Sequence, residues 1–350
     1  MNILVTAIGG GGHGEQVLKA LSMAGNADYR IFGADMNPDC PQKKLTEGFE
    51  ILPSANSDLY LEELIKVLKR LDIHVLIHGC EPELRVFSKN RELFKQLGVL
   101  VLINNSEIID LCMNKVKTNE KLKSLGLNPP KYIELNSIND LSLIDWYPVV
   151  VKPSCGGGGS ADVFICQSRH ELVNLAEYLH LGDDGKNFMV QEYVGTADEE
   201  YTVGVLSDLN GNFINSIAVK RLMSGQLNIR SSVPNRSTRH DLGNKLVISS
   251  GVSQGHVGKF PIVTSQCEDI ARQLGSTGPL NIQCRLVKGE VKVFEINPRF
   301  SGTTSLRAMV GFNEPDLLIR KHLFDEEIET SFRFDSGLII RSLQENRVND

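Results

Sequence analysis

The chain lacks several features that would assign it to a well-marked class of protein. Its 37 lysines and arginines are outnumbered by 43 aspartates and glutamates, and the net charge of −6 gives no reason to expect nucleic acid or an anionic membrane as a partner. No apolar run reaches the roughly 18 residues that a membrane-spanning helix needs. The first residues lack a basic segment ahead of the apolar run, so they predict a strand and not a signal peptide.

The cysteines also lack the spacing of a metal site or a disulfide framework. No C-x-x-C pair occurs among the seven, which stand at positions 40, 80, 112, 155, 166, 267 and 284. An odd, scattered set is typical of reduced thiols. We therefore expect a cytoplasmic protein that holds any anionic ligand through a local cluster of donors.

The chain is long enough for two or three packed units, and its pattern changes along its length. A continuous apolar run at 2–8 predicts a strand buried on both faces of a parallel sheet. Alternating strand and helix signals continue to about residue 110, so residues 1–110 predict a Rossmann-like, doubly wound α/β domain. Residues 111–187 carry helices followed by a strand-loop-strand-helix pattern, which predicts a small α+β lid.

Residues 188–350 are rich in strand signals. Two hairpins are predicted, one around Asn210-Gly211 and one around Lys288-Gly289, with a helix between them. This part therefore predicts an α+β domain with an antiparallel sheet. The fold class is α/β.

A glycine-rich turn follows the first strand. Gly9, Gly11 and Gly14 match G-x-G-x-x-G, and Asp35 lies about 20 residues further on, as in a dinucleotide site where the acid binds a ribose hydroxyl. The plainer interpretation is that these glycines let a strand turn sharply into a packed helix. An NAD(P)-dependent oxidoreductase thus remains an alternative at this point.

A second glycine loop, residues 156–160, follows Val151-Lys152-Pro153. It lacks the Gly-Lys-Ser/Thr ending of a P-loop, and a strand follows where that motif requires a helix. Consecutive backbone N–H groups in such a loop can bind phosphate oxygens, and Lys152 adds a fixed positive charge. An ordinary hairpin loop is the alternative, but the lysine at the strand end favours phosphate.

Two further strand ends carry carboxylates that fit a nucleoside. Glu192, Tyr193 and Val194 follow an apolar strand and can offer an acceptor, a backbone N–H and apolar walls to an adenine. Glu200 opens the next strand, where a carboxylate could hold ribose hydroxyls. Taken singly, each carboxylate is more often solvated.

The segment from Glu295 to Arg299 is the most informative. Glu295 and Asn297 are two residues apart on a strand and share a face, which suits Mg²⁺ bound jointly with phosphates. Gln283 lies on the partner strand. A plain two-residue turn would face Gln283 away from Glu295, whereas a bulge at Gly289 with positive φ would bring both to one face.

Taken together, in their order along the chain, these segments resemble the ATP-grasp enzymes, most closely in pattern the large subunit of carbamoyl-phosphate synthetase. The resemblance implies that Lys115 or Lys117, Lys152 and the loop at 156–160 contact ATP phosphates, and that Glu192, Tyr193 and Val194 hold adenine and Glu200 the ribose. The implied ATP-binding residues are Lys115, Lys152, Gly156, Gly157, Gly158, Gly159, Ser160, Glu192, Tyr193, Val194 and Glu200, and the implied metal ligands are Gln283, Glu295 and Asn297.

The sequence holds one synthetase unit, without a glutaminase domain or an effector-binding tail, so we expect single-unit chemistry like that of D-alanine–D-alanine or pyrrolysine-biosynthesis ligases. The resemblance implies a Mg-ATP-dependent ligase that joins a small carboxylate to an amine through an acyl phosphate, with two Mg²⁺ ions, or Mn²⁺ in their place. Lys152, Arg299 and Arg307 are the expected catalytic residues. A homodimer is compatible with this interpretation, and a catalytically silent ATP-grasp protein is a further alternative.

Overall fold

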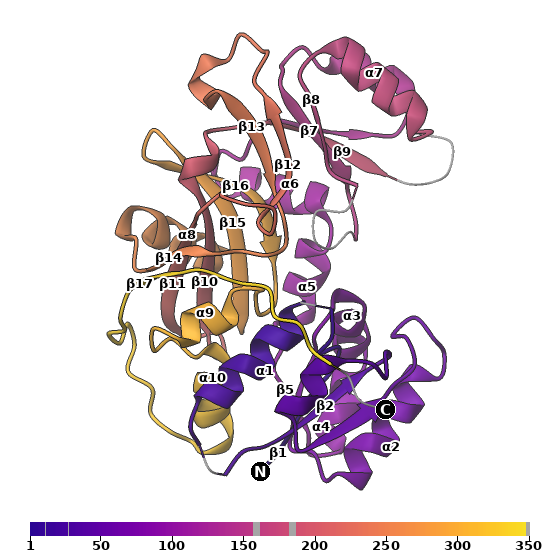
Figure 1. Ribbon diagram of the computed structural model, residues 1–350, viewed down its shortest axis with the longest axis vertical. Coiled ribbons are helices and arrows are strands. Elements are labelled where there is room, and N and C mark those ends of the chain that lie inside the picture. Colours follow the sequence, from indigo (N-terminus) through magenta and orange to yellow (C-terminus); the bar gives the residue numbers. More distant parts are fainter. Residues whose placement is uncertain (11, 27, 157–161, 182–186, 348–350) are drawn as a thin grey trace.

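A computed structural model describes residues 1–10, 12–26, 28–156, 162–181 and 187–347. Three sheets dominate it, and in Figure 1 the N-terminal sheet lies at the bottom, a six-stranded sheet in the middle and a four-stranded sheet at the top. The α/β fold with a parallel N-terminal sheet and antiparallel sheets elsewhere is as predicted.

The N-terminal sheet is parallel, in the order β3-β2-β1-β4-β5. Ile3 and Val5 pack on the side of α1, while Leu4 between them packs on the side of α2, so the apolar run is buried on both faces. The strands are β1 (Asn2–Val5), β2 (Arg30–Asp35), β3 (Gly48–Ile51), β4 (Val75–Ile77) and β5 (Leu100–Val101). The helices are α1 (His13–Met23), η1 (Pro41–Leu45), α2 (Tyr60–Arg70), α3 (Glu81–Lys89) and α4 (Arg91–Gln96).

The central sheet has the order β16-β15-β10-β11-β14-β17 and its paired strands are antiparallel. Both predicted hairpins form within it, as β10–β11 and β15–β16. Its strands are β10 (Glu200–Ser207), β11 (Phe213–Arg221), β14 (Gly255–Gly258), β15 (Pro279–Val287), β16 (Glu290–Asn297) and β17 (Gly337–Ile339). Helix α8 (Pro261–Leu274) covers one face, and α9 (Thr304–Ala308) and α10 (Glu314–Leu323) connect the other face to α1.

The upper sheet has the order β6-β9-β7-β8. It consists of β6 (Tyr132–Leu135), β7 (Val149–Pro153), β8 (Phe164–Cys166) and β9 (Phe188–Glu192), and it carries α7 (Arg169–Tyr178) and η2 (Ile138–Leu143). Helices α5 (Ser106–Cys112) and α6 (Lys115–Ser124) connect it to the N-terminal domain. The predicted boundary after residue 187 falls between β8 and β9, inside this sheet.

A separate two-stranded ribbon, β12 (Ile229–Pro234) with β13 (Lys245–Ser249), stands beside the upper sheet. Gln167 fixes the two together, because its Nε2 donates to Pro234 O at 3.0 Å and its Oε1 accepts from Arg236 N at 2.7 Å. The short helices η3 (Ala197–Glu199) and η4 (His240–Leu242) complete the elements of the described residues. Among those residues, no helix has the length and apolar character that crossing a membrane requires.

Candidate active site

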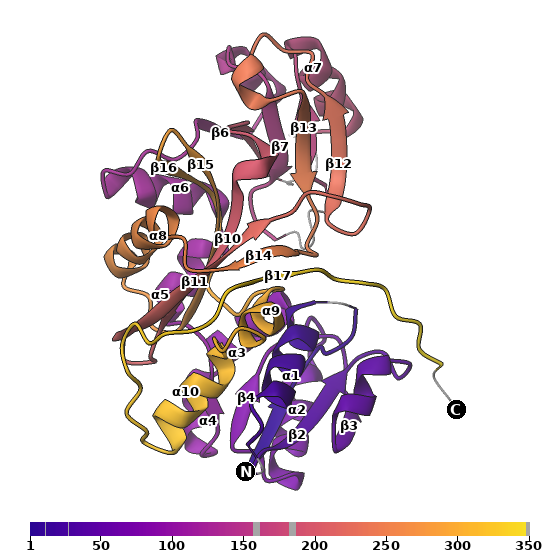
Figure 2. The same ribbon diagram turned by 60° about the vertical axis from the view of Figure 1, so that its left-hand side comes forward.

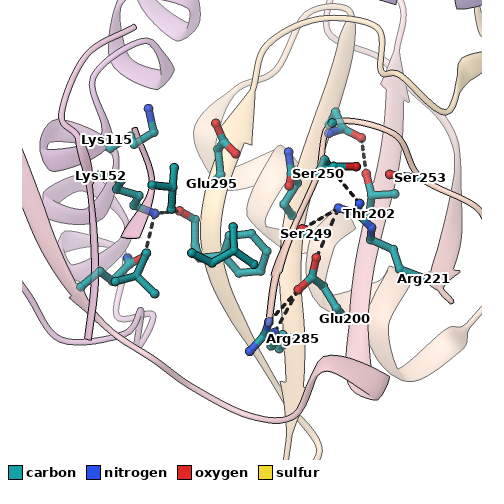
Figure 3. Close-up of a pocket in the computed structure, with 18 of the residues that line it drawn as sticks. Lys115, Lys152, Glu200, Thr202, Arg221, Ser249, Ser250, Ser253, Arg285 and Glu295 are labelled. Carbon is teal, nitrogen blue, oxygen red and sulfur yellow. Dashed lines mark hydrogen bonds and ion pairs between the residues drawn. The ribbon is translucent and has the colours of Figure 1, made fainter. Parts of the chain in front are cut away.

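A cavity of about 180 Å³ lies between the upper sheet, the central sheet and the β12–β13 ribbon. Figure 3 shows residues from all three elements turned toward it. Its walls include these predicted site residues: Lys115, Lys152, Gly156, Glu192, Tyr193, Val194, Glu200, Gln283, Glu295 and Arg299. Asn297 lines a smaller adjoining cavity with Lys115, Glu295 and Arg299. Residues Gly157, Gly158, Gly159 and Ser160 fall outside the described part of the chain.

Lys152 is fixed at the end of β7 by contacts from two sheets. Its Nζ donates to Gln191 Oε1 and to the backbone carbonyl of Phe294, both at 2.8 Å. Burial lowers the pKa of Lys152 to about 7, with the nearby Glu295 carboxylate opposing the shift and the charge of Lys115 adding to it. The Lys152 side chain is therefore held in place and only partly protonated near neutral pH.

Of the two candidate lysines on α6, only Lys115 lies at the cavity. Lys115 lines the cavity and donates to Gly156 O at 3.1 Å, beside the second glycine loop. Lys117, two residues later on α6, is exposed and does not line the cavity.

The pairing of β15 and β16 brings Gln283 opposite Glu295. Asn281 pairs with Asn297 and Gln283 with Glu295, after which the register shifts and Cys284 pairs with Val293. Of the two alternatives at Lys288-Gly289, the plain two-residue turn forms: Val287 pairs directly with Glu290, and φ is positive at both turn residues. Gln283 and Glu295 nevertheless share a face, because a bulge lies further along the hairpin. The extra residue is Phe294, and it turns the two side chains to one face.

The donor set of this face fits Mg²⁺. Glu295 forms no ion pair with any residue that the structure describes, and Figure 3 shows its carboxylate standing between Lys152 and the serines of the far wall. Asn297 is 6 % exposed, and its Oδ1 accepts from Arg299 Nη2 at 3.2 Å. The described residues contain no group of three His, Cys, Asp or Glu that could hold a metal. A shell shared with phosphates, which Mg²⁺ accepts, suits this sparse set.

The residues that were expected to hold adenine are fixed by several contacts. The Tyr193 ring is buried, the Arg285 guanidinium stacks 4.5 Å above it, and Arg285 Nη1 donates to Val194 O at 3.2 Å. Apolar side chains of Val150, Val247 and Ile248 line the same cavity. Arg239, in the connection between β12 and β13, places its Nη1 3.3 Å from Glu192 Oε1, so the ribbon contacts the end of β9.

Glu200 lies at the wall but is already engaged. It is 2 % exposed and accepts from Arg221 Nη1 at 3.2 Å and from Arg285 Nη2 at 2.9 Å. A ribose hydroxyl would have to share these oxygens with two guanidinium groups. Sequence reasoning missed both arginines, although Arg285 lies two residues from Gln283 on β15 and the strand period places both on one face.

Of the two arginines that were expected to be catalytic, one lines the cavity and the other does not. Arg299 lines the cavity and its Nη2 lies 3.2 Å from Glu81 Oε1 of the N-terminal domain. Arg307 does not line it: it is 1 % exposed and pairs with the equally buried Glu314 at 3.0 Å. The expectation that Arg307 orients a substrate is therefore wrong, because its charge is taken up inside the protein. Glu81 was missed, since no local motif links it to Arg299 across more than 200 residues.

The first glycine loop supports the plainer interpretation. Asp35 Oδ2 accepts from Gly9 N at 2.7 Å, and its Oδ1 accepts from Asn37 N at 2.9 Å, so the acid holds the turn together. A Cβ on Gly14 would lie 2.4 Å from Ala7 O, which explains the glycine by close packing. Gly11 lies outside the described residues. The carboxylate that a dinucleotide would need is thus engaged.

Two known protein families match separate parts of the chain. Residues 184–346 match the family described as "ATP-grasp in the biosynthetic pathway with Ter operon", and residues 3–102 match "PylC-like, N-terminal domain". Together these matches cover most of the chain, which belongs to the ATP-grasp superfamily.

Individual relatives are distant. The chain is 26% identical over 261 residues to a carbamoyl phosphate synthase large chain of Thermoplasma acidophilum, covering 71% of this chain and 23% of that protein. It is 28% identical over 163 residues to D-alanine–D-alanine ligase A of Bacillus cereus, covering 45% of this chain and 51% of that protein. The chain thus spans about a quarter and about half of these two relatives.

Among solved structures, the biotin carboxylase domain dimer of Hydrogenobacter thermophilus 2-oxoglutarate carboxylase, in complex with MgADP, ADP and bicarbonate, shares the fold. The TM-score is 0.63 at 15% identity, with 91% of this chain and 68% of that chain covered.

Proposed function

We propose that the protein is a Mg-ATP-dependent carboxylate–amine ligase that works through an acyl phosphate. The observation that carries the proposal is the convergence on one cavity of Lys152 from β7 and of the Gln283–Glu295 pair from the β15–β16 hairpin. One wall offers cations and the other oxygen donors, which is what a nucleoside triphosphate with its divalent ion requires.

The chemistry follows from charge. A carboxylate oxygen attacks the γ-phosphorus, the bond to the β,γ-bridging oxygen breaks, and ADP leaves. An amine nitrogen then attacks the acyl carbon, the C–O bond to phosphate breaks, and the nitrogen loses a proton. Lys115 and Lys152 bind phosphate oxygens and offset the charge that develops on the transferring group. Mg²⁺ held by Gln283, Glu295 and Asn297 would neutralise phosphate charge further.

Arg299 is the residue that we assign to the acid substrate. Its Nη1 donates a hydrogen bond to Phe300 O at 2.9 Å. Its Nη2 faces Glu81 and Asn297, beside the proposed metal ligands. A planar guanidinium at this point can turn a carboxylate toward the γ-phosphate. Glu81, from the first turn of α3, sets the angle of that guanidinium.

The three sheets also suggest a division of the chain into three domains. We propose an N-terminal domain to about residue 110, a lid that ends after Glu192 so that its sheet stays whole, and a catalytic domain built on the central sheet. Strand β9 then belongs to the lid. Because β9 is paired with β7, it moves together with Lys152 on β7.

Hydroxylamine tests the proposal without knowledge of the amine. The protein is incubated with MgATP, hydroxylamine and a panel of small carboxylic acids, and hydroxamate and ADP are measured together. Equal amounts of hydroxamate and ADP with at least one acid, both absent in Glu295→Gln, are expected. Nucleotide binding without any acid-dependent ADP release would instead identify a catalytically silent protein. Binding of NADH, followed by its fluorescence, would favour the oxidoreductase.

A further inference from the structure

The C-terminal segment contacts two loops that form one wall of the cavity, although no described residue of the segment itself lines the cavity. Strand β17 pairs with β14 at the edge of the central sheet, and the chain then runs past α9 and α1. Figure 2 shows this yellow segment crossing between the central sheet and the N-terminal domain. It continues along that domain as far as Arg347, whose carbonyl accepts from Lys44 Nζ at 2.9 Å.

Arg341 is the residue of this segment that joins three separate parts of the fold. Its guanidinium donates to Ser253 O from Nε at 2.9 Å, to Gln16 Oε1 from Nη1 at 2.9 Å and to Gly302 O from Nη2 at 2.6 Å. Its backbone N–H donates to Gln254 Oε1 at 3.0 Å. Helix α1, the loop before β14 and the loop after β16 are thereby fixed to one side chain.

Two of these three parts form the wall of the cavity next to Arg299. Ser253, Ser301 and Gly302 line the same cavity as Arg299, and we call these four residues the acid end. A Cβ built on Gly302 would lie 3.2 Å from Gly251 O, so the two loops touch. Since Arg341 binds the carbonyls of Ser253 and Gly302, it sets how these loops stand relative to each other.

Arg341 forms no ion pair with a described residue; burial lowers its pKa, and the more distant Glu15 carboxylate opposes that shift. Its three acceptors are neutral oxygens, and no carboxylate of a described residue lies within ion-pair distance of it. Glu15, on the same helix as Gln16, is paired with Lys19 at 2.5 Å. A partly buried cation that is not in an ion pair raises the potential around it, which favours an anionic ligand nearby.

We infer that Arg341 is a positioning residue for the carboxylate substrate: it holds the acid end in shape and makes it positive, without touching the nucleotide. This inference rests on the proposed ligase function. It adds that substrate binding depends on the C-terminal segment up to Arg341, whereas MgATP binding does not. We expect the residues after Ser342 to be dispensable for this role.

Four variants test the role of Arg341. Arg341→Gln removes both the positive charge and the hydrogen bonds that hold the loops, whereas Arg341→Lys keeps the charge but cannot reach three acceptors. Arg333→Gln changes an exposed arginine of the same segment and is the matched control. A chain ending after Ser342 retains Arg341 and tests the residues beyond it.

The first readout is kinetic, with hydroxamate formation from the best acid of the panel. In Arg341→Gln the KM for the acid should rise by about tenfold or more while the KM for MgATP stays within about twofold, as expected when a charged hydrogen-bonding group is lost at one subsite. The KM for the acid in Arg341→Lys should lie between those of the wild type and Arg341→Gln. In Arg333→Gln and in the shortened chain, both KM values should match the wild type. Wild-type KM for the acid in Arg341→Lys, or an equal rise of both KM values in Arg341→Gln, would overturn the inference.

The second readout does not need the ligase reaction. Hydrogen exchange of the MgADP-bound protein should be faster at residues 250–254 and 301–305 in Arg341→Gln than in the wild type, with the dissociation constant of MgADP unchanged by calorimetry. If no acid gives hydroxamate in the wild type, the proposed function fails while this measurement still decides the role of Arg341. Unchanged exchange at both loops would reject that role.

Discussion

Lys152 donates a 2.8 Å hydrogen bond to the backbone carbonyl of Phe294, the residue that bulges from the β15–β16 ladder. The same bulge turns Gln283 and Glu295 to one face. One irregularity in a hairpin therefore positions Lys152, the proposed phosphate ligand, relative to the oxygen donors. The upper and central sheets, which carry the two halves of the site, are joined at this point.

Replacing Glu295 by glutamine should abolish turnover and leave the fold intact. The change removes the one carboxylate of the proposed metal set, so kcat should fall by at least roughly a hundredfold, the scale of losing one electrostatic stabiliser. The side chain keeps its size and is not fully buried, so the free energy of unfolding should change by less than about 1 kcal/mol. ADP release at saturating MgATP measures the first effect and circular dichroism the second. Glu290→Gln, at the exposed start of the same strand, is the control, and near-normal turnover in Glu295→Gln would contradict the assignment.

Nucleotide binding should weaken as the pH rises above about 7. Burial lowers the pKa of Lys152 to about 7 in the free protein, so the side chain loses its charge above that pH, whereas a bound polyphosphate favours the charged form and raises the pKa. Binding at pH 8 should therefore take up a proton. Calorimetry in two buffers of different ionisation enthalpy measures this uptake. Lys152→Arg, which stays charged, should show little uptake, and an equal uptake in both proteins would assign the proton to another group.

Removal of Glu314 should destabilise the protein strongly. Arg307 and Glu314 are each 1 % exposed and pair at 3.0 Å, so Glu314→Ala leaves a buried cation without its partner, at a cost of about 3–5 kcal/mol. Urea unfolding of wild type and variant gives the difference. Glu62→Ala, which breaks a solvent-exposed pair with Lys66, should leave the urea midpoint unchanged. A small effect at Glu314 would return Arg307 to consideration as a substrate ligand.

Cys155 should be the thiol that alkylating reagents modify first. It is exposed and lies next to Gly156 of the cavity wall, whereas Cys40, Cys112, Cys166, Cys267 and Cys284 are buried and Cys80 is partly buried. MgATP should slow the modification, and modification should inhibit turnover, because the nucleotide would occupy the adjoining space. Mass mapping after limited alkylation identifies the site. Full activity with Cys155 quantitatively alkylated would show that the loop is not needed for turnover.

Much of the fold was predictable because its signals are local. The apolar run at 2–8 can be buried only between two layers of helices, and each hairpin carries its turn residues, Asn210-Gly211 and Lys288-Gly289. Most of the predicted residues that line the cavity were predictable for the same reason, because they lie at strand ends in short motifs. The pairing of β9 with β6 and β7 was not predictable, because it joins segments that are far apart in the sequence.

The amino-acid sequence by itself determined the superfamily and the set of groups that could bind MgATP, since residue type and spacing are sufficient for both. Only the tertiary structure decided which of these groups line the same cavity. It placed the bulge at Phe294 and not at Gly289, selected Lys115 over Lys117, and buried Arg307 against Glu314. It also brought Glu81 and Arg341 to the acid end from distant parts of the chain. These outcomes depend on packing and on competition for buried partners, which no local pattern of residues encodes.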